Sequence, residues 1–557
     1  MRSLHELVFR LRQEARNAAA FIRPPAFSGD AKPPVRLANP APVAKRLEHT
    51  PFAQHVVALA EEILEHRFRL FGYEVLTGPD INWRRDYVHK RSSGAEYFRR
   101  IPYLDFPQIG DHKIIWELNR HQHLVLLAQA HLLTGRPEFH SEICDQIESW
   151  WTANPFLQGI NWTSALEVAL RALSWIWIWH LTGERMAADF RRRFLESLYR
   201  HGCHIDRNLS IYFSPNTHLL GEAVALHALG ALFPSFPDAA RWESKGARIV
   251  GQQLQSQVRA DGSHFEQSLS YHIYALDMFL FHYVLANTGA EFQEKLKRMA
   301  EYLAALTSPS GYVPSLGDDD GGRFFHPYGD RGRFAAETLA TFGALFPEHA
   351  PQSAQRAGDA QAAWWVPDYP ANDQNAREPV ATSQLFPDAG IAVMRAHDLQ
   401  LIVDAGPFGP GSAGHSHSDT LSIVASAGAE EILIDPGTFT YVSDPKARNW
   451  FRGSAAHNTV RVDEHDQAVP AGPFRWIRVP GVKIVEWNST ADRDYLHAIC
   501  TTYDAIHRRR VLLLKGDAIA VIFDEVEAAA GEHLVEQFWH PGAETRPAGT
   551  GATSNRW

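Results

Sequence analysis

Four short stretches of the chain carry the residue types that acid–base catalysis or metal binding requires. The first is "AGHSHSDTLSI" (413–423), in which His415 and His417 stand two positions apart, before an apolar run. On a strand, side chains two positions apart lie on the same face of the sheet. The two imidazoles are therefore candidates for metal ligands, for a catalytic pair or for parts of a polar turn. Their spacing alone does not separate these possibilities.

Residues further along the chain extend this first stretch into a candidate metal site. Asp435 in "LIDPG" and His457 in "AAHNTV" adjoin strand-like runs, so neighbouring strands of one sheet could bring them to His417. Two histidines, an aspartate and a water suit zinc. Single histidines in strands are more often hydrogen-bonded core residues, and that alternative stays open. We expect Asp419, directly before the apolar run, to make turn hydrogen bonds.

The other three stretches add donors and proton carriers. "NWFRGSAAHNTV" contains Arg452, whose forked guanidinium could bind a carboxylate or a sulfate. "SPNTHLLGE" contains Asn216, which fits a helix N-cap, and His218 in the first turn, where the helix dipole disfavours protonation. "DGSHFEQSLSYHIYALD" places Tyr271 and His272 at the start of another helix, where packing is the ordinary role of such a pair.

Helical periodicity dominates the chain from about residue 52 to 345. Apolar residues recur at three- and four-residue spacing in four clear runs, and several of the runs end in Gly: 121–135, 164–183, 217–233 and 274–289. Helical hairpins that recur at intervals of roughly 40–50 residues are typical of a solenoid or of a closed α/α toroid.

Short β-rich runs replace the helices after a loop over 353–379. They include "GIAVMRA", "LQLIVDAG", "TLSIVASA", "EILIDPG", "VKIVEW" and "AIAVIFDEV", separated by turn residues as in an antiparallel sandwich. The predicted fold is α+β and multidomain: an N-terminal helix and Pro-rich strap over 1–51, an α/α toroid over 52–350 and an antiparallel β-sandwich over 380–557. The ending "RPAGTGATSNRW" closes a sandwich weakly, so we expect the β domain to be incomplete there or its tail to be short.

Composition excludes several classes of protein. The net charge of -10 over 557 residues leaves no global basic surface for nucleic acid, so an acidic polymer would bind through a local cluster of Arg, Lys and His. Cys144, Cys203 and Cys500 form no CxxC pattern, which argues against a disulfide framework and a thiolate zinc site. No run reaches the roughly 18 apolar residues of a membrane span, so we expect no membrane partner. The N-terminus reads as an amphipathic helix and not as a signal peptide, which predicts a cytoplasmic location, or a periplasmic or secreted one if a leader is missing.

In this order, across a helical and then a β-rich region, the four stretches resemble the heparinase II/III-like polysaccharide lyases, whose relatives include alginate and oligoalginate lyases. The most specific part is "GHSHSD…LIDPG…FRGSAAHNTV", while "INWTSALEVALR" (160–171) and "LGDDDGGR" (316–323) are weaker echoes. One departure is that Thr217 separates Asn216 from His218, whereas family members often carry Asn directly before the histidine. The resemblance implies a toroid followed by a β-sandwich, and cleavage of a uronic-acid polysaccharide or oligosaccharide by β-elimination to give 4,5-unsaturated ends.

The resemblance also implies roles for individual residues. It places Tyr271, His218, His415 and Asn216 in catalysis, with His415 facing the cleft. A divalent metal, zinc, would be held by His417, Asp435 and His457 and would have a structural role. The residues expected to contact the substrate are Asn161, Trp162, Arg171, Glu222, His272 and Arg452. The identity of the uronate polymer and the oligomeric state stay open.

β-Elimination at a uronate sets three tasks. The carboxylate must be neutralised, the C5 proton removed and the departing glycosidic oxygen protonated. Asn216, with His218 or His415, fits the first task. Tyr271 fits the second and third together if the proton and the leaving group share one face of the sugar. If they lie on opposite faces, we expect a histidine to act as the base and Tyr271 as the acid.

Two alternatives from other classes stay open. A glycoside hydrolase on an α/α barrel needs two carboxylates that flank the bond, and Glu222, Glu266 or the aspartates at 318–320 could supply them. A non-catalytic protein that binds acidic glycans needs no proton carriers, although the Tyr and His set is present here. Detection of unsaturated products that absorb ultraviolet light separates the lyase from both.

Overall fold

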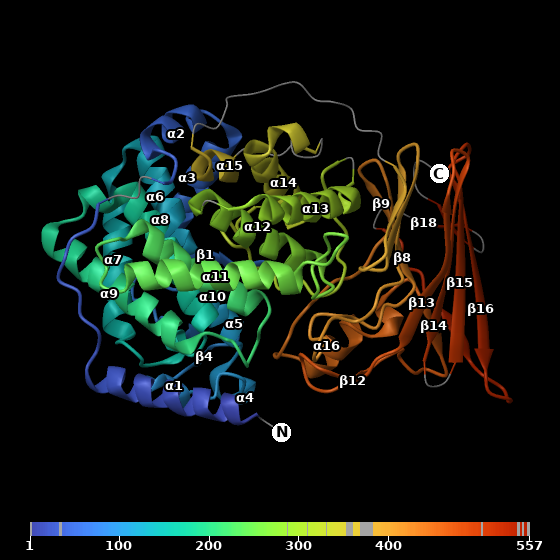
Figure 1. Cartoon of the computed structure of the whole chain (residues 1–557), viewed down its shortest axis with the longest axis horizontal. Helices are drawn as coiled ribbons and strands as arrows, with labels where there is room; N and C mark the ends of the chain where they lie inside the picture. The colour runs from blue at the N-terminus through green and yellow to red at the C-terminus, as the bar shows by residue number, and fades with distance from the viewer. Residues whose placement is uncertain are drawn as a thin grey trace.

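The computed structural model describes residues 3–32, 36–286, 288–308, 310–329, 331–351, 360–367, 382–502 and 505–542, and the backbone of 546–548 and 551–553. Figure 1 shows a helical part formed by the N-terminal region beside a part built of β-sheets. This arrangement confirms the predicted fold class, an α/α toroid followed by an antiparallel β-sandwich. No helix in the described ranges is long and apolar enough to cross a membrane.

The helical part alternates buried helices with half-buried ones. Helices α6, α8, α10 and α12 are buried around most of their circumference, and α7, α9, α11 and α13 bury one face, as expected for the inner and outer rings of a toroid. In the helical part, the α-helices among the described residues are α1 (Leu4–Ile22), α2 (Pro40–Leu47), α3 (Pro51–Leu64), α4 (Phe106–Ile109), α5 (His112–Asn119), α6 (Gln122–Thr134), α7 (Pro137–Ala153), α8 (Ala165–Thr182), α9 (Ala188–Asn208), α10 (Thr217–Leu232), α11 (Ala239–Gln257), α12 (Leu269–Leu285), α13 (Ala290–Leu306), α14 (Phe334–Leu345) and α15 (Ala360–Trp365).

The toroid region also contains structure that the sequence did not predict. Helix α2 forms within the Pro-rich strap because Pro40 occupies the first helical position and the side chain of Asn39 caps the helix. Two short hairpins precede α5: β1 (Arg67–Leu70) with β2 (Tyr73–Leu76), and β3 (Arg85–Asp86) with β4 (Arg91–Ser92). Helix α15 lies within the predicted loop over 353–379, and the rest of that loop is outside the described residues except for 366–367.

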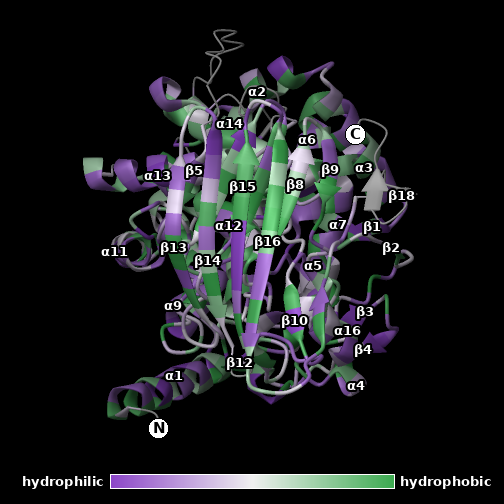
Figure 2. Cartoon of the chain, turned by 90° about the vertical axis from the view of Figure 1, so that its right-hand side faces the viewer, coloured by the Kyte–Doolittle hydropathy of each residue, from purple (hydrophilic) through white to green (hydrophobic). Residues whose placement is uncertain are grey.

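Two antiparallel sheets form the sandwich. One has five strands, β5 (Gln384–Phe386), β6 (Ile391–Ala396), β7 (Leu399–Asp404), β8 (Ser422–Ala427) and β9 (Glu430–Leu433); the other has four, β13 (Gly481–Ser489), β14 (Arg493–Thr501), β15 (Ala505–Leu514) and β16 (Ile519–Ala528). They share a buried core that includes Met394, Leu401, Val403 and Ile423 from the first sheet and Leu496, Val511 and Leu513 from the second. The four-stranded sheet turns its other face outward (Figure 2).

Smaller elements complete the β part. Between the sheets in sequence lie helix α16 (Pro445–Phe451) and the short strands β10 (Val460–Val462), β11 (Val469–Pro470) and β12 (Trp476–Arg478). Strand β17 (Val535–Gln537) pairs with β10, and β18 (Arg546–Ala548) pairs with β19 (Gly551–Thr553). The last residues of the predicted weak ending, 554–557, lie outside the described part.

Candidate active site

A cavity of about 490 Å³ lies between the toroid and the β part. Its wall includes the side chains of Asn216, His218 and Tyr271 from the toroid and of His415 from the β part. The structure therefore brings together all four residues proposed for catalysis. A site between two domains is also where ligand pockets preferentially form.

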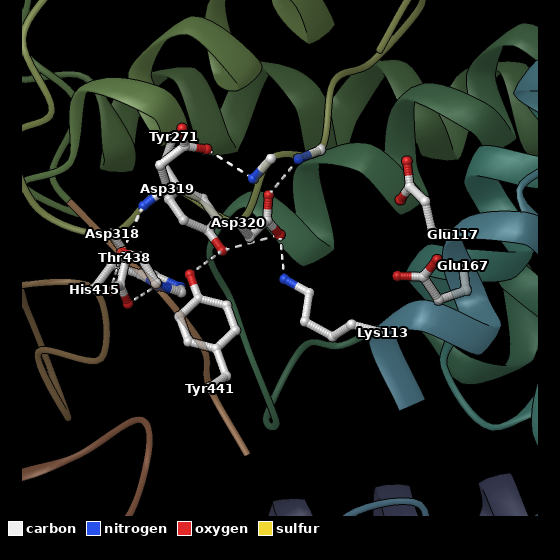
Figure 3. Close-up of polar contacts among 12 residues, drawn as sticks. Lys113, Glu117, Glu167, Tyr271, Asp318, Asp319, Asp320, His415, Thr438 and Tyr441 are labelled. Carbon is white, nitrogen blue, oxygen red and sulfur yellow. Dashed lines mark hydrogen bonds and ion pairs between the residues drawn. The ribbon is translucent and has the colours of Figure 1, made fainter. Parts of the chain in front are cut away.

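Tyr271 is held against His415 at the start of α12. The hydroxyl of Ser268 caps this helix and accepts a hydrogen bond from the Tyr271 backbone N–H (3.3 Å). The Tyr271 ring stacks on the His415 imidazole, with centroids 3.9 Å apart and planes at 25°. Its hydroxyl lies 3.4 Å from Asp320 Oδ2 and 3.5 Å from Tyr441 Oη (Figure 3). Burial, and then the negative charge of Asp320, raise the pKa of Tyr271 well above its usual value, so the phenol keeps its proton at neutral pH.

Asp318, from the "LGDDDGGR" loop, joins the toroid to the β part. Its side chain is fully buried and accepts hydrogen bonds from His415 Nδ1 (3.1 Å), His417 Nε2 (2.9 Å), Thr438 Oγ1 (3.0 Å) and both terminal nitrogens of Arg448 (2.5 and 2.8 Å). Burial opposes ionisation, but Arg448 and the two histidines hold the pKa of Asp318 well below its usual range. An ionised carboxylate only accepts hydrogen bonds, so the Nδ1 of His415 carries a proton. The other ring nitrogen, Nε2, is not bound by Asp318 and is on the side of the cavity.

The backbone of this loop is fitted closely to the β part. Asp318 N–H donates to the carbonyl of His415 (2.9 Å). Gly317, just before it, has a positive φ of 66°, and a Cβ there would lie 2.6 Å from the carbonyl oxygen of Gln267 and 2.9 Å from that of His415. Only glycine fits this approach. The stretch 406–421 is a loop before β8, so the strand geometry considered for His415 and His417 does not apply. Both rings nevertheless reach one carboxylate.

A second polar group lines the cavity beside Tyr271. Lys113 Nζ lies 2.7 Å from Asp320 Oδ2 and 4.4 Å from the centre of the Tyr441 ring (Figure 3). Burial opposes the charge of Asp320, yet Lys113 and then Arg120 hold the pKa of Asp320 below its usual range. The group thus places a fixed cation and a fixed anion around the Tyr271 hydroxyl.

Asn216 and His218 occupy the start of α10. The Asn216 side-chain oxygen caps the helix through His218 N–H (3.1 Å), and its Nδ2 donates to Glu266 Oε1 (2.6 Å). Glu266 also accepts from Thr217 N–H (3.3 Å) and lies 3.6 Å from His415 Nε2. Burial lowers the pKa of His218 to about 4, so this imidazole is neutral at pH 7.

A cluster of possible metal ligands lies behind His415. Ligand atoms of His417, Asp419 and His457 all fall within 4.8 Å of one another, and all three residues are buried. His417 gives its Nε2 to Asp318, and His457 gives its Nδ1 to Asp435 (2.7 Å). Each ring therefore keeps one buried nitrogen, Nδ1 of His417 and Nε2 of His457, with no hydrogen-bond partner among the described residues.

These free nitrogens and the Asp419 carboxylate fit a cation. Each histidine is oriented by a carboxylate on its other nitrogen, as metal-ligating histidines usually are. Burial raises the pKa of Asp419 above its usual value. The cluster differs from the predicted set in one member: Asp419 lies in the ligand group, and Asp435 holds the far side of His457.

None of the six residues predicted to contact the substrate is among the residues that line the cavity in the described structure. All six are buried and bonded within the protein, because the sequence places them on inner helices or under loops. Asn161, Trp162 and Arg171 belong to one internal network, in which Arg171 donates to the carbonyl of Asn161 (2.9 Å). Glu222 accepts from the backbone N–H of Ser210. His272 binds the carbonyl of Met299, and Arg452 donates to the carbonyl of Gly472.

Several residues at the cavity were not predicted as site residues. Asp318 and Asp320 stand in a run of acidic residues that first suggests a solvated loop, and Arg448 binds Asp318 from α16. Lys113 and Tyr441 belong to no recognisable motif. The sequence marked the three aspartates through the weak echo "LGDDDGGR" and as possible hydrolase carboxylates, but it does not say which carboxylate enters which contact.

The fold and the site define the class of the protein: a helical toroid and a β-sandwich that share one polar cleft, in which a tyrosine stacks on a histidine. Within that class the comparison with protein families is specific. The heparinase II/III N-terminus family matches residues 43–326, and the heparinase II/III-like C-terminal family matches residues 378–554. The chain belongs to the heparinase II/III family.

Curated relatives and solved structures agree with this assignment. The chain is 23% identical over 466 residues to a heparin-sulfate lyase of Pedobacter heparinus, covering 80% of this chain and 64% of that protein. It is 24% identical over 439 residues to a heparin-sulfate lyase of Bacteroides thetaiotaomicron, covering 73% and 58%. The crystal structure of heparinase III is 19% identical, covers 93% of this chain and 76% of that one, and superposes with a TM-score of 0.65, which shows the shared fold. The matched region is less than two thirds of the length of either curated relative.

Proposed function

We propose that this chain is a polysaccharide lyase that cleaves a uronic-acid-containing glycosaminoglycan, or oligosaccharides of it, by β-elimination. The observation that carries the proposal is the stack of Tyr271 on His415, with Asp318 bound to the far nitrogen of that imidazole. A proton donor and a proton acceptor thus stand side by side in one cleft. Family membership and the heparin-sulfate lyase relatives support this reaction and favour a substrate of the heparan sulfate kind.

His415 is the base in this proposal. Asp318 holds its Nδ1–H, so the lone pair of Nε2 is available to take the C5 proton of the uronate. The imidazolium that forms is then stabilised by the same carboxylate, as in an Asp–His pair of a hydrolase. His218 is a poorer base, since its pKa of about 4 leaves it neutral but weakly basic.

Tyr271 is the acid. Its raised pKa keeps the hydroxyl protonated, and the proton passes to the glycosidic oxygen as the C4–O bond breaks and the C4–C5 double bond forms. The developing phenolate would lie between Tyr441 and the Lys113–Asp320 pair. After product release the imidazolium of His415 loses one proton and the phenolate of Tyr271 gains one. No water is consumed, and both side chains recover their starting states.

Asn216 and His218 are placed to neutralise the substrate carboxylate. One Nδ2 hydrogen of Asn216 binds Glu266, which leaves the second for the substrate. His218, neutral and in the cavity wall, can donate one ring N–H. Two neutral donors stabilise enolate-like charge without forming a salt bridge that would favour the ground state.

A divalent metal, zinc, is proposed to be held by His417, Asp419 and His457. Nitrogen and oxygen donors in this number match a zinc site. When bound, the metal would supply a structural cross-link within the β part. It would hold the loop that carries His415, since His417 is two residues further along the chain. The free buried nitrogens of the two histidines support this assignment.

The arrangement supports a hydrolase less well. Asp318 is bound to Arg448, Asp320 to Lys113, and Glu266 to Asn216, so the carboxylates near the stack are committed to other groups. Glu222, another candidate, is fully buried, accepts a hydrogen bond from Ser210 and is not among the residues that line the cavity. A glycan-binding protein without catalysis would have no need of the paired Tyr271 and His415.

The proposal is tested by incubation of the parent protein with heparan sulfate, heparin, chondroitin sulfate, hyaluronan and alginate. A lyase produces ends that absorb in the ultraviolet and have the mass of a sugar minus one water. A hydrolase produces fragments that have gained a water and do not absorb. Fragments of the second kind, or binding without any fragments, would overturn the proposal.

A further inference from the structure

Helix α1 lies along the lower edge of the helical part in Figure 1 and has an inverted amphipathic pattern. The side chains that it turns toward the body recur mostly every three or four positions, and four of the six are polar: Glu6, Phe9, Arg10, Gln13, Asn17 and Ala20. The opposite face exposes Leu4, Leu7 and Leu11 to 74%, 44% and 72%. A helix that packs only for stability buries its apolar face, so the inward polar face requires another explanation.

The inward face of α1 borders the cavity. Phe9, Arg10 and Gln13 belong to the cavity wall that also includes Tyr271 and His415. They precede the segment matched by the heparinase II/III N-terminus family, which begins at residue 43. Part of the cleft is thus built by a helix outside the matched segments.

Specific contacts fix α1 in this position. Asn17 and Asn208 exchange hydrogen bonds through their side-chain amides (2.8 and 3.2 Å), and both residues are buried. Gln13 donates to the carbonyl of Arg207 (3.1 Å). The Phe9 ring packs edge-on against Tyr212, with centroids 5.2 Å apart. The helix is therefore set against the loop that leads into α10.

A corner with arginine and aromatic side chains results. Arg10 and Arg99 both line the cavity there, and their side chains are 34% and 35% exposed. The Arg10 guanidinium contacts Glu6 (2.8 Å), and the Arg99 guanidinium contacts Glu14 (3.0 Å), both on α1. An arginine has five N–H donors, so each retains donors for an anion in the cavity. Phe213 adds an exposed ring to the same wall, suited to the apolar face of a sugar.

We infer that α1 forms a subsite of the cleft, in which Arg10 binds a carboxylate or sulfate of a sugar unit away from the bond that is cleaved. The inference rests on the proposed function for the identity of the glycan, but its core is a binding site and not a reaction. The subsite makes longer acidic oligosaccharides bind more tightly than a disaccharide that occupies only the Tyr271 end.

The test measures binding by calorimetry with the full chain carrying Tyr271→Phe, so that no turnover occurs. The probes are a size-defined heparan sulfate hexasaccharide and a heparan sulfate disaccharide. Arg10→Ala is compared with Arg12→Ala, a matched control on the same helix, whose side chain is exposed and outside the cavity wall. Loss of the charged contact is expected to weaken hexasaccharide binding by about 5- to 10-fold. Arg12→Ala is expected to stay within about twofold, the range of a surface charge change.

Arg10→Lys keeps the positive charge and should recover part of the affinity for the hexasaccharide. Equal thermal midpoints for all variants would show that folding is unaffected. The disaccharide should bind the Arg10→Ala and Arg12→Ala chains equally. Equal hexasaccharide affinities for these two variants would overturn the subsite, as would an absence of hexasaccharide binding to the Tyr271→Phe chain. If the parent yields no unsaturated product but Arg10→Ala still weakens binding, the lyase proposal fails and the subsite stands.

Discussion

Replacement of Asp318 by asparagine changes one atom of the residue that joins the two parts of the molecule. The carboxylate is fully buried, and Arg448 and two histidines donate to it. Asparagine removes the negative charge and leaves the Arg448 guanidinium buried without its counterion. Loss of one partner from a buried ion pair costs about 3–5 kcal/mol, a large share of the roughly 5–15 kcal/mol that stabilises a typical domain.

The amide must also point its NH₂ group at one set of donors. Oδ1 accepts from three groups, Arg448, His417 and Thr438, whereas Oδ2 accepts from Arg448 and His415. Placing the NH₂ at the Oδ2 position disturbs fewer contacts. His415 would then accept at Nδ1 and carry its proton on Nε2, which is the wrong tautomer for a base. We expect turnover to fall by at least about 10²-fold.

Asp319→Asn is the matched control in the same loop. Its Oδ1 accepts from Gly321 N–H (2.7 Å), which asparagine also allows, and its other oxygen is 4.0 Å from Arg331. The expected loss of unfolding free energy is below about 1 kcal/mol, as for partly exposed ion pairs. Guanidinium denaturation measures both variants, and an ultraviolet assay of product formation measures turnover. If Asp318→Asn unfolds and turns over like Asp319→Asn, the interdomain role assigned to Asp318 is wrong.

Further expected outcomes concern pH and metal. Burial raises the pKa of Glu222 to about 8 in the folded chain. In the unfolded chain the carboxyl has its ordinary pKa of 4.5, so between these two values only the folded chain keeps the proton. This contribution to stability is complete below about pH 4.5 and is lost as pH rises through 8, with a slope of up to about 1.4 kcal/mol per pH unit. Glu222→Gln should flatten the slope measured by denaturation between pH 5 and 8, and an unchanged slope would contradict the assignment. His417→Ala should abolish the metal detected by elemental analysis and lower the thermal midpoint, and chelation of the parent chain should have the same two effects. A parent chain that is purified without chelators and contains no metal would refute the site.

The division into toroid and sandwich could be predicted because the period of apolar residues changes from helical to alternating near 350–380. Strand β14 was missed, since its inward positions include Asp494 and its outward ones include Tyr495 and Ile499, which blurs the alternation. The apolar run over 274–289 also does not coincide with α12, which spans Leu269–Leu285. Its cap at Ser268 lies before the first strongly apolar run, and this cap is what places Tyr271 in the first turn.

The four residues proposed for catalysis could be picked out from their motifs, and the structure brings them to one cavity, whereas the residues that hold them there could not be picked out. Arg171 shows why: it stands on α8, which is buried on every side, and its charge is used to bind the carbonyl of Asn161. A sequence does not reveal that a helix belongs to the inner ring with its polar groups bonded internally. The three aspartates at 318–320 diverge for a similar reason, because the turn that separates Asp318 from Asp320 is set by contacts with the β part.

The central claim is that Tyr271 protonates the leaving oxygen beside His415. The most direct measurement is the rate of unsaturated product formation by Tyr271→Phe, with Tyr283→Phe as the matched control on the same helix, outside this cavity. The account predicts that Tyr271→Phe folds with an unchanged thermal midpoint and loses at least about 10²-fold in turnover, while Tyr283→Phe keeps parental turnover. Near-parental product formation by Tyr271→Phe would contradict it.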